Sequence, residues 1–455
     1  MARMRVRGQP RKLLEIRQDA SPIFAALLIV PFVALLATGA ANIATHIVPD
    51  FWIGPLALAV PFCVAYLFSP PPFARTRKFP TMIVAAALLY AAMCVADFVL
   101  IDTSFLPIFT RRMEFMVFII FFIVLMRNSP SAFAITTLRW CMPIATLGVI
   151  ADSYFPPMTA FLNKIMPSER LAYADAHRAF GLFINPNAAG SILALFSVLC
   201  SYGLSIPKRA FFYAVGLAGI LASGSRGSLL LWAAGIVLCE ILTVNPAGKV
   251  RVLWIRAAAG VTALVVVAAI AAAHNQGTRA VSVDPGGGQA SVARLTTTGD
   301  ASTRDRLILM QHAWSVFQSR PAFGWGVGYD YNWDMPLPVH NIYLGMLVEH
   351  GLAGILWLMF FFFTLTKSPA PFNVIAPVMI AIKGITNHSV FNEIDDAFVL
   401  AMFATGRGWI PAQTERPRVA SPRSYSRPAP RRRIPPTHPA DTHSEPADSS
   451  AVQNS

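Results

Sequence analysis

Apolar residues in this sequence fall in long blocks, each about as long as a helix needs to cross a membrane. Roughly 20 helical residues span a hydrocarbon layer about 30 Å thick. Only 13% of the 455 residues are charged and 55% are hydrophobic, against about 25% charged in an ordinary soluble domain. This excludes a soluble enzyme, a disordered scaffold and a fibrous protein, and predicts an all-α polytopic membrane protein. We expect about twelve transmembrane helices, at 22–45, 51–69, 80–101, 113–127, 132–151, 187–206, 210–223, 228–243, 253–273, 341–366, 371–387 and 394–407.

The basic residues predict which side of the membrane each loop faces. The net charge is +14, and most loops rich in Lys and Arg follow even-numbered blocks. Cytoplasmic loops collect these residues, so we expect both termini to be cytoplasmic. Arg111 and Arg112, after the third block, are the clearest short-loop exception and are interpreted as contacts to lipid headgroups. The charge is therefore attributed to topology, and we expect no nucleic-acid partner.

The chain divides into three predicted regions. Residues 1–21 form a basic cytoplasmic N-terminus, and residues 22–408 form the transmembrane domain. Residues 409–455 are rich in Pro, Ser and Arg, cannot bury a core, and are expected to be a disordered cytoplasmic tail. Two long loops would face outward, one over about 151–186 and the other over 274–340.

One arginine on the outer side lies in a junction too short to form a domain. The segment is Ser223-Gly224-Ser225-Arg226-Gly227-Ser228. An arginine near membrane depth is costly without a partner, and small neighbours would let a bulky anion approach the backbone N–H groups. Arg226 is therefore a candidate anion-binding residue; the alternative is an arginine that extends to lipid headgroups.

Two more outer arginines begin a predicted amphipathic helix on the outer membrane face. Pro321 ends this helix. Arg304 and Arg306 would occupy its first turn, where the helix dipole disfavours cations. A bound diphosphate would explain that placement, as would lipid headgroups or pairing with Asp305. A stripe at helical spacing is assigned to packing and contains Leu307, Met310, Trp314 and Phe317.

Two further outer positions are candidates. Arg178 precedes Asn185-Pro186-Asn187, a turn and helix-start signal for which a capping role suffices. His340 stands where the long loop meets the tenth block, and an imidazole can take a proton near neutral pH. A role for His340 requires the outer arginines to converge with it, and spacing alone does not show this.

Other clusters are given structural interpretations. The glycine-rich run 324–328 follows a helical pattern and not a strand, so we expect a surface loop and no nucleotide site. Glu393, Asp395 and Asp396 could hold a divalent ion, but we expect them to flank the last helix in water. The five cysteines lie in apolar blocks without a CxxC pair and are expected to be small buried residues.

Several segments of this chain, taken in their order along the sequence, resemble the O-antigen ligase and polymerase superfamily. The resemblance rests on 178–187, 223–228, 306–321, Gly324 to His340-Asn341-Ile342-Tyr343-Leu344, and Glu349-His350-Gly351-Leu352-Ala353-Gly354. It covers about residues 170–365 in detail. Family members often carry Trp four residues after the arginine of the interfacial helix, where this chain has Met310. Arg304 therefore remains an alternative to Arg306.

The resemblance implies a C-type glycosyltransferase-like fold in a bacterial inner membrane, with residues 22–408 as the catalytic domain. The donor would be a glycan on undecaprenyl diphosphate, presented on the periplasmic side. Arg226 and Arg306 would bind its diphosphate, with Arg178 as a third cation. His340 would activate or position the acceptor hydroxyl. The resemblance implies neither a metal nor a nucleotide sugar, and no cofactor is expected.

Several functions remain open at this stage. A ligase would transfer a whole glycan to lipid A–core, whereas a polymerase would join repeat units of an O-antigen or exopolysaccharide. The superfamily also includes members that glycosylate proteins. A polysaccharide or solute transporter is the alternative from another class, but transporters favour charges near the bilayer midplane. Here the unusual charges crowd the outer boundary.

Overall fold

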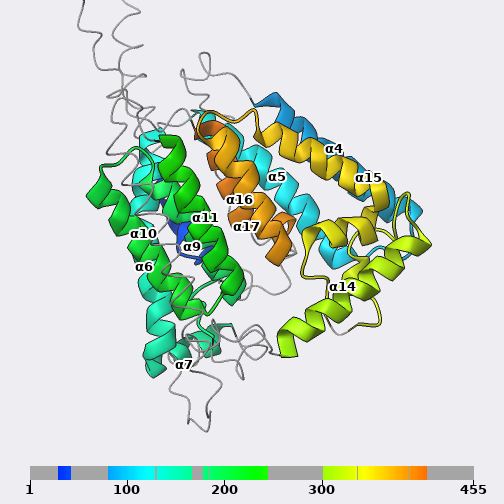
Figure 1. Cartoon of the computed structure of the whole chain (residues 1–455), viewed down its shortest axis with the longest axis horizontal. Coiled ribbons are helices and arrows are strands. Elements are labelled where there is room, and N and C mark those ends of the chain that lie inside the picture. Colours follow the sequence, from blue (N-terminus) through cyan, green and yellow to red (C-terminus); the bar gives the residue numbers. More distant parts are fainter. Residues whose placement is uncertain are drawn as a thin grey trace, which may run out of the picture. The chain divides into compact units, whose positions relative to one another are not determined.

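The computed structural model describes residues 29–42, 80–128, 131–166, 178–183, 185–243, 301–335, 337–387 and 389–406. Every regular element in these ranges is a helix (Figure 1). Three are long and apolar enough to cross a membrane: α4 (Thr81–Leu100), α6 (Ser131–Tyr154) and α15 (Ile342–Leu365). The expectation of a helical membrane protein is confirmed at this level.

Most of the predicted blocks correspond to helices of the described part. Besides α4, α6 and α15, these are α5 (Leu106–Asn128), α9 (Pro186–Ser201), α10 (Ile206–Ser223), α11 (Arg226–Thr243), α16 (Phe372–Thr386) and α17 (Ile394–Thr405). Residues 29–37 of the first block are also helical. The blocks at 51–69 and 253–273, the loop 274–300, and both terminal regions lie outside the described residues. The twelve-helix count and the region boundaries therefore stay predictions.

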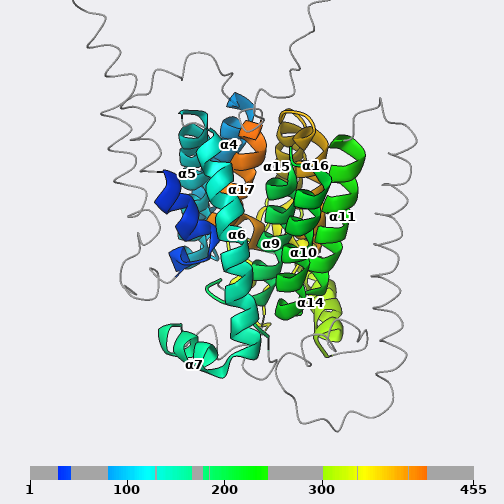
Figure 2. The same cartoon turned by 90° about the vertical axis from the view of Figure 1, so that its left-hand side faces the viewer.

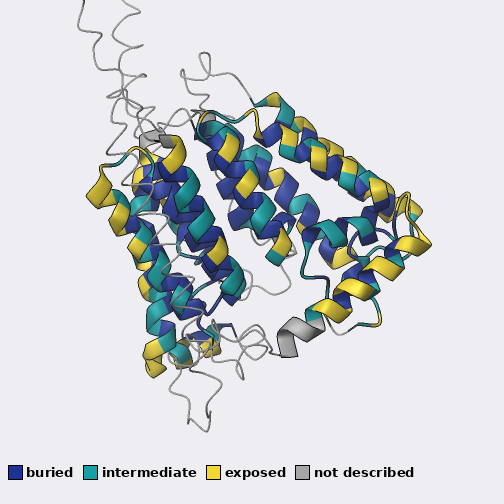
Figure 3. Cartoon of the chain, in the orientation of Figure 1, coloured by how far each residue is buried: buried dark blue, intermediate teal, exposed yellow. Residues whose placement is uncertain are grey.

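Helix α9 is the buried centre around which the neighbouring helices pack. It contacts α6, α10, α11 and α17, and the first three lie beside it in both views (Figures 1 and 2). Every residue from Ala188 to Ser201 is buried. A helix that is apolar on all sides belongs in such an interior position. The exposed apolar side chains instead lie on surrounding helices, including α4, α6 and α15 (Figure 3).

The segment between the third and fourth predicted blocks differs from our expectation. Helix α5 begins at Leu106 and not at 113, so Arg111 and Arg112 lie within a helix and not in a loop. Arg111 is exposed, whereas the side chain of Arg112 is 3% exposed and forms an ion pair with Glu349. The interpretation of Arg112 as a headgroup contact is therefore wrong, because its charge is paired inside the protein.

The acidic residues at the start of the last helix also have surroundings that differ from our expectation. Asp395 and Asp396 are buried within α17, not exposed to water, and Asp396 forms an ion pair with the buried Lys383 of α16. Glu393 precedes α17 and is buried too. Charged groups at such depth need a partner, which the linear sequence did not identify.

Two further helices lie in the long predicted loops. The short helix α7 (Pro156–Ile165) follows α6, and α14 (Ala301–Ser319) ends just before Pro321 as predicted. Because α14 begins at Ala301, Arg306 lies in its second turn and not in its first. The predicted packing stripe is largely exposed at Leu307, Met310 and Trp314. Phe317, the last member of the stripe, is buried as predicted, and the other buried positions are Leu309 and Ala313.

Helix α15 is kinked at Gly351. This glycine has φ 60° and ψ −147°, a conformation that side chains strongly disfavour. The kink lets Leu352 N donate to the carbonyl of Pro321 at 2.8 Å, and Ala353 N to that of Ala322 at 3.3 Å. The chain after α14 therefore docks directly onto the interrupted helix.

A side chain at Gly351 is expected to destabilise the protein. A Cβ there would lie 2.6 Å from the carbonyl oxygen of Pro321, and the backbone strain adds about 1–3 kcal/mol. Gly351→Ala should lower the melting temperature in detergent. Gly345→Ala in the same helix is the control, because a Cβ there meets nothing within 4 Å. Equal melting temperatures for the two variants would contradict this account of the kink.

Candidate functional site

Three of the four candidate anion-binding arginines line a single cavity. Arg178, Arg226 and Arg306 all border it, and its space of about 470 Å³ is partly open to solvent. Each of these side chains is half-buried. The convergence that the sequence could not show is therefore present for three arginines. The side chain of the fourth, Arg304, lies outside the described residues.

The cavity forms where the ends of several helices meet. Helices α9 and α11 begin at it, with Asn187 and Arg226 in their first turns, while α10 and α16 end at it. Arg306 comes from the second turn of α14. The first turn of a helix carries unsatisfied N–H groups and a partial positive charge. The starts of α9 and α11 thus supply N–H donors, while the ends of α10 and α16 carry the opposite partial charge, so the positive charge of the cavity comes from the three guanidinium groups.

The rest of the described lining is small or polar and contains no acidic side chain. Apart from the arginines and two glycines, it consists of Asn187, Ser191, Ser225, Ser228, Thr386 and Asn387. Three cations gathered in one partly enclosed cavity favour an anionic ligand. Hydroxyl and amide groups can complete its hydrogen bonds.

Helices α9, α11 and α16 pack closely beside the cavity, with glycines at their contacts. A Cβ at Gly190 would lie 2.7 Å from the Ser228 hydroxyl, and one at Gly227 would lie 2.7 Å from Thr386. Gly224, with φ 63°, ends α10 and allows α11 to begin two residues later. The small residues noted in the sequence thus bring the starts of α9 and α11 together at the cavity.

Arg178 is held in place by contacts to two helices. Its Nε donates to the carbonyl of Ser223 at 3.1 Å, and its Nη2 donates to Asn187 Oδ1 at 2.8 Å. The turn that follows Arg178 is fixed by Asp152, which accepts the N–H groups of Phe180 at 2.9 Å and Gly181 at 3.1 Å. Arg178 therefore braces the start of α9 against the end of α10 as well as lining the cavity.

The two asparagines of the predicted helix-start signal have different roles. Asn185 caps α9, accepting the N–H of Ala188 at 2.8 Å, as expected. Asn187 accepts hydrogen bonds from Arg178 and from the Ser225 hydroxyl, the latter at 3.3 Å. A capping role alone is therefore insufficient for Asn187, because its amide oxygen joins two segments of the cavity wall.

His340 is not among the residues that line the cavity, but it lies near enough to Arg306 for the charge of that arginine to affect it. It lies just before Asn341, whose side chain caps α15 by accepting the N–H groups of Tyr343 and Leu344. Burial, together with the positive charge of Arg306, lowers the pKa of His340 from 6.5 to about 4. Its imidazole is therefore neutral at physiological pH, which is the form that can accept a proton.

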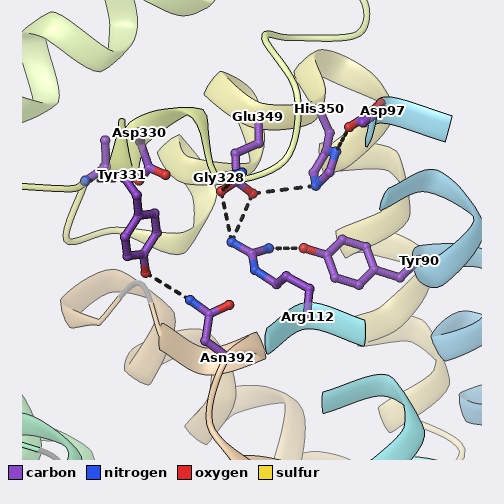
Figure 4. Close-up of polar contacts among 10 residues, drawn as sticks. Tyr90, Asp97, Arg112, Gly328, Asp330, Tyr331, Glu349, His350 and Asn392 are labelled. Atoms are coloured by element: carbon purple, nitrogen blue, oxygen red, sulfur yellow. Dashed lines mark hydrogen bonds and ion pairs between the residues drawn. The ribbon is translucent and has the colours of Figure 1, made fainter. Parts of the chain in front are cut away.

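The sequence interpretation missed a buried polar network beside the loop 324–339 (Figure 4). Its centre is the ion pair of Arg112 with Glu349, at 2.9 Å, and it extends to Tyr90, His350 and Asp97. A charge within an apolar block was the available signal, since Glu349 lies inside the predicted block 341–366. Its partner was hidden because Arg112 had been assigned to a loop.

In the described part of the chain, Glu393, Asp395 and Asp396 do not form a metal site. Among the described residues, no group of three or more His, Cys, Asp and Glu side chains is arranged to hold a metal ion. The carboxylate of Asp396 is instead bonded to Lys383. The glycine-rich run 324–328 is a loop, as predicted, but it is not at the surface, because all of its residues except Trp325 are buried. It packs against α15 through the bonds of Trp325 N and Gly326 N to backbone carbonyls.

Residues 211–359 match the family described as O-antigen ligase. The match contains Arg226, Arg306 and His340, and Arg178 lies before it. No curated protein matches the chain.

Proposed function

We propose that the protein, whose residues 211–359 match the family described as O-antigen ligase, is an inner-membrane glycosyltransferase. It moves a glycan from undecaprenyl diphosphate to an acceptor hydroxyl on the periplasmic side, with both termini in the cytoplasm. The single observation that carries this proposal is the shared cavity of Arg178, Arg226 and Arg306. A lipid-linked diphosphate is the anion that such a cavity suits.

In this proposal the cavity binds the diphosphate of the donor. Guanidinium groups bond phosphate oxygens in a fixed geometry, and N–H groups at helix N-termini bind phosphate as well. Arg226 and Arg306 would make the direct contacts. Arg178 would contribute its charge while holding Asn187 and Ser223 in place. Arg304 remains an untested alternative to Arg306.

The transfer itself would be one in-line displacement. The acceptor oxygen attacks the anomeric carbon, and the bond between that carbon and the diphosphate oxygen breaks. The bonding pair leaves with the diphosphate, whose added charge the arginines stabilise. The hydroxyl proton passes to the neutral imidazole of His340. A single displacement inverts the anomeric configuration.

The placement of the cavity agrees with the proposed sidedness. It lies at the C-terminal ends of α10 and α16 and at the N-terminal ends of α9 and α11. All four ends are on the outer side in the topology that the distribution of basic residues predicts. A donor presented at the periplasmic surface would therefore reach it without crossing the bilayer.

A ligase and a polymerase would use this site in the same way, so the acceptor distinguishes them. The proposed acceptor is lipid A–core, with growing polysaccharide or another hydroxyl as the alternative. Purified protein in proteoliposomes, given undecaprenyl-diphosphate glycan and each acceptor in turn, tests this directly. We expect transfer to continue in EDTA and to give one addition per acceptor for a ligase, or a ladder for a polymerase. Solute uptake without transfer would instead favour a transporter and contradict the proposal.

A further inference from the structure

The buried ion pair of Arg112 and Glu349 joins three parts of the protein. Arg112 comes from α5 and Glu349 from α15, and their side chains are 3% and 1% exposed. Arg112 Nη2 lies 3.0 Å from Oε1 and 2.9 Å from Oε2 of Glu349 (Figure 4). Oε1 also accepts the backbone N–H of Gly328 at 3.0 Å. The carboxylate therefore ties the loop 324–339 to both helices.

The bonds around Glu349 fix the beginning of this loop. Trp325 N donates to the carbonyl of Val348, and Gly326 N donates to the backbone carbonyl of Glu349, each at 2.9 Å. On the opposite side, Phe105 N donates to the carbonyl of Val327 at 2.8 Å. Four consecutive residues, 325–328, are thus held between α15 and the segment that leads into α5.

Asp330 connects the held part of the loop to His340. Its Oδ2 accepts the N–H of Val339 at 3.1 Å, and Val339 immediately precedes His340. Burial and the negative charge of Glu349 raise the pKa of Asp330 well above its ordinary value. Tyr331, the next residue, accepts a hydrogen bond from Asn392 at 2.9 Å. Both ends of the segment 328–339 are therefore bonded in place.

Stability alone is a weak explanation for such a buried pair. Ions are expensive to bury, and apolar residues of similar volume often give equal or greater stability. Catalytic groups, in contrast, must be held by residues whose own positions are fixed. An error of about 1 Å in the position of a reacting group can reduce a rate by about 10²-fold.

We propose that Arg112, Glu349 and Asp330 are positioning residues that set the place of His340 relative to the arginine cavity. The inference rests on the proposed function, in which His340 accepts the hydroxyl proton. The network touches neither Arg226 nor Arg306 in any of these contacts. It therefore governs the chemical step and leaves donor binding to the cavity.

Glu349→Gln tests the first part of the proposal in proteoliposomes. We expect kcat for glycan transfer to fall by about 10²-fold, with the donor KM changed by less than about twofold. The matched control is Glu240→Gln. Glu240 also forms a largely buried pair, with Arg209 at 2.8 Å, but at the ends of α10 and α11 remote from the cavity. This control should retain wild-type kcat.

Hydrogen–deuterium exchange supplies a readout that does not depend on activity. In Glu349→Gln, amides of the peptide 324–340 should exchange about tenfold faster or more, while those of 226–243 should not change. Asp330 offers a second pair of variants that leaves the Arg112 pair intact. Asp330→Leu removes the acceptor for Val339 N and should lower kcat and speed exchange. Asp330→Asn retains an acceptor oxygen and should restore both.

The outcomes separate this inference from the proposed function. Wild-type exchange of the loop in Glu349→Gln, or a kcat loss in Glu240→Gln as large as in Glu349→Gln, overturns the inference. Faster exchange across all helices in the Glu349 and Asp330→Leu variants also overturns it, because the role would then be general stability. A wild-type protein that transfers no glycan overturns the proposed function, and the catalytic part of this inference with it, whatever the exchange data show.

Discussion

Arg226→Ala is expected to reduce glycan transfer by about 10²–10³-fold, because it removes a cation that faces the charge developing on the leaving diphosphate. Arg306→Ala should give a loss of similar size. Both side chains border the same cavity, whose described lining holds no carboxylate. The loss should appear in kcat/KM for the lipid-linked donor, measured in proteoliposomes with a fixed acceptor.

Two comparisons make this result specific. Lys208→Ala removes the same charge from an exposed position at the opposite end of α10 and should retain full activity. Arg226→Lys keeps the charge but loses the forked geometry, so its activity should lie between wild type and Arg226→Ala. Full activity in Arg226→Ala, with normal surface polysaccharide in cells, would contradict the site.

His340→Ala is the second variant with a large expected effect. Removing a positioned base typically slows a reaction by about 10²–10⁴-fold. The donor KM should change little, because the arginine cavity is intact. Expression and membrane insertion should also be normal, since His340 lies before α15 and Asn341 provides its cap. His340→Gln is the matched variant: it fills the same space but cannot accept the proton, so it should be as slow as alanine.

The proposed role of His340 also predicts how activity changes with pH. Only neutral His340 can accept a proton, so activity is lost as the pH falls through its pKa. In the free protein that pKa is about 4, lowered by burial and by Arg306, and kcat/KM should hold to near that pH. A bound diphosphate offsets the charge of Arg306 and should raise this pKa. The acid limb of kcat should therefore lie at higher pH than that of kcat/KM, and both should vanish in His340→Gln.

Much of the helical framework followed from local pattern. The apolar blocks identified nearly every described helix, and Asn185 and Pro321 marked a start and an end correctly. The charge pattern also singled out Arg178, Arg226 and Arg306 as unusual before their convergence was known. These predictions succeeded because hydropathy over about 20 residues and helix capping are properties of short stretches of chain.

The errors concern residues whose partners are distant in sequence. Arg112 was assigned to headgroups although its partner Glu349 lies on another helix, and Asp396 was assigned to water although Lys383 neutralises it. The burial of a charge depends on which group faces it. In both pairs that group belongs to a different helix, so no local pattern could identify it.

By itself, then, the sequence determined that the chain forms apolar helices suited to a membrane and that certain arginines stand apart from the usual charge pattern. Tertiary structure alone decided that three of those arginines share one cavity and that Glu349 holds the loop leading to His340. The physical reason is how far apart in the sequence the interacting residues lie. Helix formation and membrane transfer are governed by neighbouring residues, whereas a cavity and a buried ion pair exist only where separate helices are packed together.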